Sequence, residues 1–365
     1  MGTYEVPPSI AVRVLPDKLR AVTEAVFRAC DVPAEAAARG ADVLVYADLR
    51  GIDSHGVSIK LRDYVNKYRS GELNPRPKIE IVRQTPATAV VDADRGLGLM
   101  VASQAMSMAM DKARQTGVGV VSVRNAGHVG ALGYYARMAA LNDMIGWTMA
   151  VSAAPKSMLP TWCAEPLLGT NPLAFAAPAH HESPFVFDAA MATVAGNKLE
   201  ILQKLGLPLP GGWVANPDGT PNLTGGEYQD FVVDSKPYQL PLGSTRERGS
   251  HKGYGLALMV DILSCNLSFA PGCAALSDRR GGHFVAAYDI AAFGDVEAFK
   301  NDMDASLRRL REARPMPGQE RVLYAGLPES EIAAERTAKG IPLHPEVVDW
   351  FRTFGAEHGL GLELK

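Results

Sequence analysis

The sequence has few cysteines, few aromatic side chains and no long apolar run. Four cysteines are scattered over 365 residues, and none stands at the spacing of a zinc ligand set, so neither a disulfide framework nor a metal site is expected. We therefore predict free thiols in a reducing, cytoplasmic environment. No stretch approaches the ~20 uninterrupted apolar residues of a membrane span, and the N-terminus lacks the apolar core of a signal peptide.

Long runs of one charge are also absent. The chain has 37 basic and 40 acidic residues, for a formal net charge of −3, and neither sign forms a cluster. A surface that binds nucleic acid or a membrane would show a basic cluster, so we expect neither partner. The hydrophobic fraction of 47% is typical of a packed globular protein, and a chain of this length buries a sizeable core without metals or disulfides.

The two ends of the chain have a helical pattern, and the middle alternates between strands and helices. Residues 16–70 carry apolar side chains at the 3.6-residue period of amphipathic helices, and the tail repeats this pattern. We predict a helical domain from residues 1–80, completed by residues 296–365, and an α/β domain over residues 81–295. The Gly- and Pro-rich stretch 206–250 is typical of a long surface excursion.

A break between two predicted helices places a histidine among small and polar residues. Ser54 stands where a helix N-cap belongs. His55, which follows it, is either a surface residue of the first helical turn or an acid/base group, because imidazole exchanges its proton near neutral pH. An adjacent hydroxyl and a nearby carboxylate could fix its tautomer.

A glycine-bearing turn follows the β-branched strand at residues 117–123. Its glycines fall at 127, 130 and 133, and free backbone N–H groups in such a turn can hold a phosphate. The G-x-G-x-x-G spacing is absent, and the next strand ends in Ser152 with no acidic residue to bind a ribose, so a Rossmann crevice is not predicted. His128 in this turn is an acid/base group, a cofactor contact or a hydrogen-bonded loop residue.

Two later segments carry candidate ligand groups. Asp188 ends an apolar strand, where α/β proteins place ligand-facing groups, or it is a plain turn residue. Residues 249–255 lead into a helix with Lys252 near its N-terminus, which is either an anion site or a tight helix start. The Gly-Lys-Ser/Thr of a Walker loop is absent.

Five segments together resemble one family in their order and spacing. They are RGIDSHGVS (50–58), NAGHVGALGYYARMAA (125–140), GTNPLAFAAP (169–178), FDAAMATVAGNK (187–198) and HKGYGLALMVDIL (251–263). The combination is similar to the malate/L-lactate dehydrogenase-like family of NAD(P)-dependent oxidoreductases. That family also holds sulfolactate, ureidoglycolate and 2,3-diketogulonate enzymes, and reductases of cyclic imino acids such as piperideine-2-carboxylate. The similarity extends from about residue 10 to 345.

The resemblance implies an α/β, non-Rossmann nucleotide-binding domain with a mixed sheet, an extra helical domain built from both chain ends, and a homodimer. It implies hydride transfer to or from C2 of a small 2-oxo or 2-hydroxy carboxylate, with NAD or NADP as cofactor. The first alternative is an imine reductase that makes cyclic or N-alkyl amino acids. The second is a catalytically inactive ligand-binding relative.

The resemblance also implies residue roles. His55 corresponds to the proton donor, assisted by Ser54 and Asp188, whereas some members assign that role to the histidine that is His128 here. The implied cofactor contacts are His128, Gly130, Ala131, Ser152, Asp188, Ala189, Ala190, His251, Lys252, Gly326, Leu327 and Pro328.

Two positions depart from the family pattern. Many relatives have an arginine four residues after the motif histidine, available for the substrate carboxylate, where this chain has Ile59. We expect Arg62, one helical turn further along the same face, to take that role, with Arg50 as a second substrate-binding candidate. The late segment 325–329 lacks the first of two glutamates, which leaves the choice between NAD and NADP open.

Overall fold

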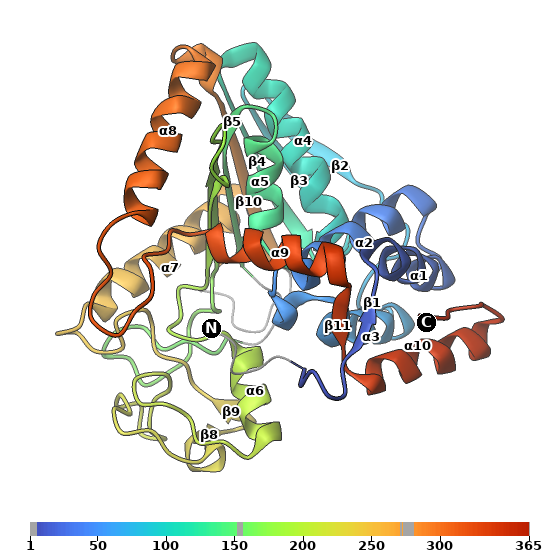
Figure 1. Cartoon of the computed structure of the whole chain (residues 1–365), viewed down its shortest axis with the longest axis vertical. Helices are drawn as coiled ribbons and strands as arrows, with labels where there is room; N and C mark the ends of the chain where they lie inside the picture. Colours follow the sequence, from blue (N-terminus) through green and yellow to red (C-terminus); the bar gives the residue numbers. More distant parts are fainter. Residues whose placement is uncertain (1–5, 152–155, 271, 273–280, 365) are drawn as a thin grey trace.

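The computed structural model (Figure 1) describes residues 6–151, 156–270, 272 and 281–364. At its centre is a seven-stranded sheet with the order β2-β3-β4-β10-β5-β6-β7. These strands are β2 (Glu80–Gln84), β3 (Thr88–Asp92), β4 (Val118–Ala126), β10 (Gly281–Asp289), β5 (Met144–Val151), β6 (Leu173–Ala177) and β7 (Phe185–Ala189). Within this sheet β3 and β4 are parallel and the other neighbours are antiparallel. A Rossmann sheet is mostly parallel with another strand order, so the predicted mixed, non-Rossmann sheet is confirmed.

Helices cover both faces of the sheet. Helices α4 (Gly98–Thr116) and α5 (Gly133–Ala140) pack on one face, and α7 (Ser250–Ser264) packs on the other. Successive strand residues point to opposite faces, and in β10 Val285 joins the cluster beneath α4 while Phe284 joins the cluster beneath α7. The close approach of α5 requires Gly146, because a Cβ there would lie 2.3 Å from the Ala136 carbonyl oxygen.

The N-terminal helices pack beside the sheet (Figure 1), and their buried side chains share one core with it. They are α1 (Pro16–Ala29), α2 (Ala34–Leu49) and α3 (Val57–Arg69). The C-terminal end of the chain joins them, because β11 (Ile341–Leu343) pairs with β1 (Val12–Val14) and α10 (Pro345–His358) packs against α1. Both chain ends therefore contribute to this part, as the sequence predicts.

Not all of the tail packs against the N-terminal helices. Helix α8 (Val296–Arg311) lies beside the edge of the sheet, far from α1 in Figure 1. Its Asp304 accepts hydrogen bonds from the backbone N–H groups of residues 180–182, and its Leu307 packs near Phe185. Helix α9 (Leu327–Lys339) then leads back toward α2. The exact division into two domains remains a prediction.

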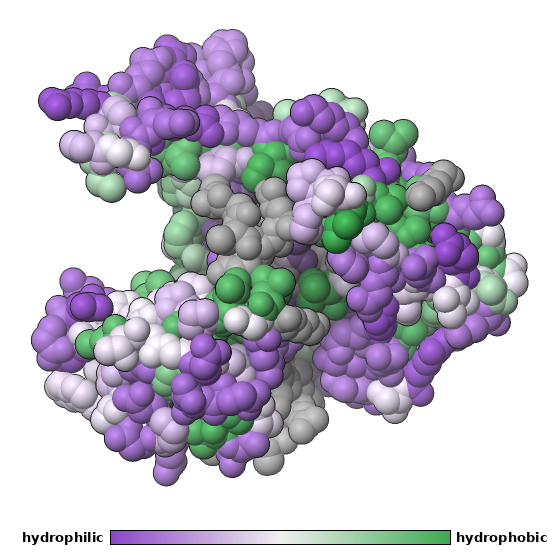
Figure 2. Space-filling model, turned by 60° about the horizontal axis from the view of Figure 1, so that its bottom comes forward, coloured by the Kyte–Doolittle hydropathy of each residue, from purple (hydrophilic) through white to green (hydrophobic). Residues whose placement is uncertain are grey.

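The stretch 206–250, predicted as a surface excursion, shares a small core with the preceding helix α6 (Gly196–Leu205). The stretch includes the short pair β8 (Val232–Val233) and β9 (Lys236–Pro237). Seven buried side chains from residues 194–231 pack together there. Figure 2 shows a deep indentation on one side of the molecule, between two lobes whose outer surfaces are mainly hydrophilic. Among the described helices, none is long and apolar enough to cross a membrane.

Candidate active site

A pocket of about 260 Å³ lies where three parts of the fold meet. The N-terminal helical part contributes His55 and Lys60, and the turn after β4 contributes residues 127–130. The third wall comes from α6 and β9, with Asn197 and Lys236. The pocket therefore brings together the two histidines that the sequence could not distinguish.

The loop that carries His55 is a short 3-10 helix, Asp53–His55, and α3 begins only at Val57. The prediction that Ser54 caps α3 is wrong, because Gly56 is the N-cap and no side chain caps the helix there. Instead the buried Asp48 carboxylate accepts the Val57 N–H at 2.7 Å. The freed Ser54 hydroxyl lies 2.9 Å from Nδ1 of His55. The sequence thus identified the Ser54–His55 pair but misplaced the helix start.

An arginine from the C-terminal part fixes this loop. Arg336 of α9 is 2% exposed and forms an ion pair with Asp53, with 2.6 Å between Nη1 and Oδ1. The same guanidinium donates to the Asp48 carbonyl oxygen. Because Asp53 begins the turn that holds His55, the tail of the chain positions the imidazole. No pattern in the sequence pointed to this contact.

His128 is held as a single neutral tautomer. Its Nδ1 lies 2.6 Å from the Tyr64 hydroxyl and accepts the Gly130 N–H at 3.2 Å. A nitrogen that accepts a backbone N–H carries no proton, so the Tyr64 hydroxyl also donates and the ring proton resides on Nε2. Burial, and next the charge of Lys60, lower the pKa of His128 well below its usual value. His128 therefore presents an N–H donor that stays neutral.

His55 is less constrained. Its ring is stacked against that of His128 with 5.7 Å between centroids. Burial first, and the Lys60 charge second, lower the pKa of His55 to about 4. A hydroxyl both donates and accepts, so the Ser54 contact persists whether Nδ1 is protonated or not. His55 can therefore change its protonation state without losing its partner.

Lys60 is the cation that reaches the pocket from α3. Its Nζ donates to Oδ1 of Asn197 at 3.3 Å, and Nδ2 of Asn197 donates to the Ser54 carbonyl oxygen at 2.8 Å. Burial lowers the pKa of the Lys60 ammonium. Asn197 thus ties α6 to both the lysine and the histidine loop.

The prediction that Arg62 and Arg50 bind the substrate carboxylate is not supported by the structure. Arg62 is directed away from the pocket, 3.5 Å from Glu346 and over the Trp350 ring. The prediction assumed that Arg62, seven residues after His55, lies on the same helical face. It fails because His55 precedes α3, so helical periodicity does not relate the two side chains. Arg50 lies over the Tyr46 ring and donates to Ser330.

Asp188 does not orient either imidazole. Its Oδ2 accepts the Gly133 N–H at 2.7 Å, at the start of α5, and within the described residues no hydrogen bond joins it to His55 or His128. Desolvation raises the pKa of this carboxyl to about 6, although much of the residue's surface is exposed to solvent. Asp188 therefore lies at the end of β7, outside the pocket that holds the two histidines.

The predicted cofactor contacts fall in three places. His128 and Gly130 line the pocket, with Ala131 buried behind them. Beside β7, the Val186 N–H donates to the Ala325 carbonyl oxygen at 3.0 Å, which brings the segment Gly326, Leu327 and Pro328 close to the strand that carries Asp188, Ala189 and Ala190. His251 and Lys252 begin α7 and do not line this pocket. Ser152 lies outside the described residues.

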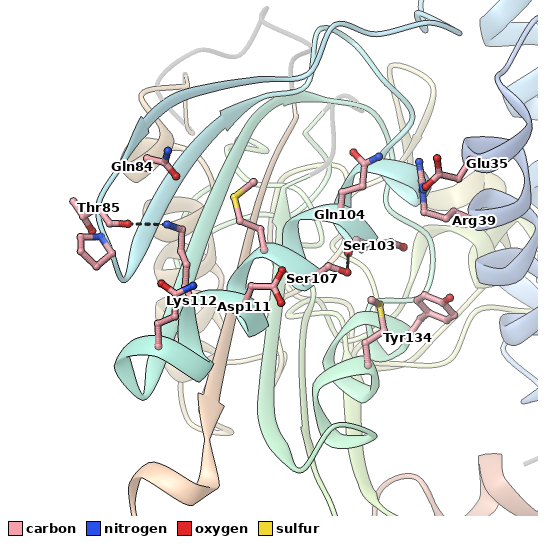
Figure 3. Close-up of a pocket in the computed structure, with 14 residues that line it drawn as sticks. Glu35, Arg39, Gln84, Thr85, Ser103, Gln104, Ser107, Asp111, Lys112 and Tyr134 are labelled. Atoms are coloured by element: carbon pink, nitrogen blue, oxygen red, sulfur yellow. Dashed lines mark hydrogen bonds and ion pairs between the residues drawn. The ribbon is translucent and has the colours of Figure 1, made fainter.

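A larger groove, of about 940 Å³, lies elsewhere (Figure 3). It runs between α2, α4 and the turn after β2, where Nζ of Lys112 donates to the Thr85 carbonyl oxygen at 2.7 Å. None of the predicted site residues lines it. Size alone therefore does not identify the active site, and we take the smaller pocket because it holds the two imidazoles.

Sequence reasoning missed several functional residues. Lys60, which lines the pocket, and Tyr64, which is buried and contacts His128, both belong to the predicted third helix, but neither was proposed as a site residue. His283 on β10 is 1% exposed and its Nε2 lies 3.1 Å from the Gly127 carbonyl oxygen. A histidine inside an otherwise apolar strand is the one signal that could have indicated it.

The chain is similar to known dehydrogenases over nearly its whole length. The family described as malate/L-lactate dehydrogenase matches residues 14–352. The chain belongs to that family. It is 39% identical to the malate dehydrogenase of Pyrococcus abyssi over 360 residues, which covers 97% of each protein. It is 31% identical to the ureidoglycolate dehydrogenase (NAD(+)) of Escherichia coli K12 over 323 residues, or 86% of each.

The solved structures show the same fold. The malate dehydrogenase of Pyrococcus horikoshii OT3 superimposes with a TM-score of 0.86 at 34% identity, covering 98% of both chains. This dehydrogenase-family chain is therefore an oxidoreductase that acts on a small hydroxy or oxo carboxylate, as the sequence predicted, and membership implies a nicotinamide cofactor.

Proposed function

We propose that the pocket between His55 and His128 interconverts a small 2-oxo carboxylate and its 2-hydroxy acid, with NAD or NADP as the cofactor. The observation that carries this proposal is the pairing of two differently held imidazoles in one pocket, 5.7 Å apart between ring centroids, next to a lysine ammonium. The nicotinamide, when bound, supplies or accepts the hydride at C2.

His128 serves as a fixed hydrogen-bond donor to the substrate oxygen. Its Nδ1 is occupied by the Tyr64 hydroxyl and the Gly130 N–H, so protonation there would cost two hydrogen bonds. Its Nε2–H can polarise a carbonyl and stabilise the charge that develops on oxygen, and donors preset for such charge contribute strongly to catalysis.

His55 serves as the proton donor in reduction. The hydride arrives at C2, the carbonyl π electrons move to oxygen, and that oxygen takes the proton from the His55 imidazolium, which becomes neutral. The pKa of about 4 belongs to the pocket without substrate, and an anionic substrate favours the charged ring. In the oxidation direction neutral His55 takes the hydroxyl proton back.

Lys60 holds the carboxylate next to C2. A half-buried ammonium beside both imidazoles pairs with a carboxylate through a charge-assisted hydrogen bond. Asn197 binds both Lys60 and the Ser54 carbonyl, so it holds the lysine and the His55 loop at a fixed position relative to each other.

The residues around the pocket fit a nicotinamide dinucleotide. The turn of residues 127–130 lines the pocket, with Gly130 at a φ of 70°, and Asp188 is exposed to solvent at the end of β7. We propose that these two places hold the cofactor, with Ala189 and Ala190. The homodimer and the cytoplasmic location remain part of this proposal.

A panel of substrates tests the proposal. Oxaloacetate, pyruvate and 2-oxobutyrate are incubated with NADH and with NADPH in parallel, and pyruvate plus methylamine serves as the imine arm. We expect saturable oxidation of one or both cofactors with a 2-oxo acid alone. Turnover only in the presence of the amine would instead indicate an imine reductase, and no binding of either reduced cofactor in a fluorescence titration would contradict the proposal entirely.

A further inference from the structure

A second lysine lines the same pocket from another part of the fold. Lys236 lies on β9, in the region that begins with α6, whereas Lys60 lies on α3. Lys236 is partly buried, and burial lowers the pKa of its ammonium. Among the residues that the structure describes, the Lys236 ammonium forms no hydrogen bond or ion pair; its electrostatic neighbour is Glu200.

An unpaired ammonium at a pocket wall indicates an anionic ligand. Removing an ammonium from water costs free energy that a partner of opposite charge restores. Glu200 raises the pKa of both Lys60 and Lys236, so all three groups lie in one neighbourhood, but Glu200 is exposed and forms no ion pair with either lysine among the described residues. With both imidazoles neutral, these three groups leave the pocket one positive charge in excess.

The location of Lys236 indicates which anion it meets. It lines the pocket that holds His55 and His128, and the carbon that is reduced must lie beside those rings to be protonated. An acidic group at Lys236 therefore belongs to the molecule that reacts, while Lys60 takes the carboxylate next to C2.

We propose that Lys236 binds a second acidic group at the far end of the substrate, so that this enzyme selects 2-oxo diacids over 2-oxo acids with an uncharged end. This inference rests on the proposed function. A dianion would match the two ammonium groups, and the proton that His55 takes up on binding would complete the charge balance.

The experiment compares two substrates that differ in charge at the far end. Oxaloacetate carries a second carboxylate, and 2-oxobutyrate replaces it with a methyl group. In Lys236→Met we expect kcat/KM for oxaloacetate to fall about 10²-fold, the order of a hydrogen bond to a charged group, and kcat/KM for 2-oxobutyrate to change less than about threefold. Lys198→Met is the matched control, since Lys198 is an exposed lysine of α6 outside the pocket.

A second variant acts in the opposite direction. Glu200→Gln removes the negative charge beside both lysines, so KM for oxaloacetate, which meets Lys60 and Lys236, should fall more than KM for 2-oxobutyrate, which meets Lys60 alone. Binding of NADH and NADPH, measured by fluorescence titration, should be unchanged in Lys236→Met.

Three other results would each contradict a different part of the proposal. An equal loss of kcat/KM for both substrates in Lys236→Met, or no loss for either, overturns the role of Lys236 in substrate choice. Weaker NADH or NADPH binding with unchanged discrimination would assign Lys236 to a cofactor phosphate instead. If the wild-type protein reduces neither substrate with either cofactor, the proposed function itself has failed.

Discussion

The Tyr64 hydroxyl lies 2.6 Å from Nδ1 of His128, although the two residues are 64 positions apart in the chain. Together with the Gly130 N–H it fixes the proton of His128 on Nε2. This contact separates the two histidines chemically: His128 is held neutral, and His55 remains free to exchange a proton.

Tyr64→Phe should lower kcat about fivefold while the fold persists, because it removes one hydrogen bond, worth about 1 kcal/mol, that fixes the His128 tautomer. Tyr68→Phe is the control. Tyr68 is a buried tyrosine of the same helix, and its hydroxyl donates to the Met100 sulfur at 3.9 Å rather than to a pocket residue. Steady-state kinetics measures kcat, and circular dichroism checks that both variants are folded. Equal effects of the two substitutions on kcat would contradict the role of Tyr64 in the site.

His55→Gln should lower kcat of reduction by about 10²–10⁴, the usual contribution of a general acid. In the wild type, kcat/KM of reduction should fall as pH rises, because the free pocket lowers the pKa of His55 to about 4 and the reaction needs the charged ring. That fall should disappear in His55→Gln and persist in His128→Gln. A pH profile that flattens only in His128→Gln would exchange the two roles.

Lys60→Met should lower kcat/KM for every 2-oxo acid by about 10–10²-fold, because the carboxylate loses a charge-assisted partner. Arg62→Met should stay within about twofold, since Arg62 lies against Glu346 and Trp350 rather than in the pocket. Kinetics of the two variants side by side is the measurement. The reverse ranking would restore Arg62 as the carboxylate-binding residue.

His283 should make the fold sensitive to mild acid. Burial lowers its pKa to about 4, against about 6.5 in an unfolded chain. Between these values the unfolded chain binds more protons, so stability is full above pH 6.5 and is lost as pH falls toward 4, by about 2 kcal/mol between pH 7 and 5. Urea unfolding at both pH values should show a smaller drop for His283→Gln; an equal drop would show that His283 does not titrate this way.

Gly56→Ala should destabilise the fold by about 1–3 kcal/mol, the range for overpacking a buried site. The added Cβ would lie 1.8 Å from Oδ1 of Asp48, the carboxylate that accepts the first N–H of α3, so activity should fall as the His55 loop shifts. At Gly294 a Cβ meets nothing within 4 Å, and Gly294→Ala should be neutral. Thermal unfolding of both variants checks this.

Local pattern was enough to predict several features of this protein. The family motifs identified the chemistry, and residues 54–55 and 127–130 were placed at the site because their chemistry and spacing are short-range properties. The pattern also predicted helices from both chain ends, whereas the mixed sheet was expected only from the family resemblance. A helix start could not be placed as reliably, because Asp48, and not the neighbouring Ser54, accepts the Val57 N–H.

Only the tertiary structure decided which side chains share the pocket. Lys60 rather than Arg62 lines the pocket, because the 3-10 turn before α3 means that helical spacing from His55 does not predict which side chains face it. Tyr64 contacts His128 because α3 packs against the turn that follows β4. Arg336 and Lys236 reach the site from segments roughly 180 to 280 residues beyond the motif histidine. Contacts at such separations depend on how the layers pack, which no local period or motif encodes.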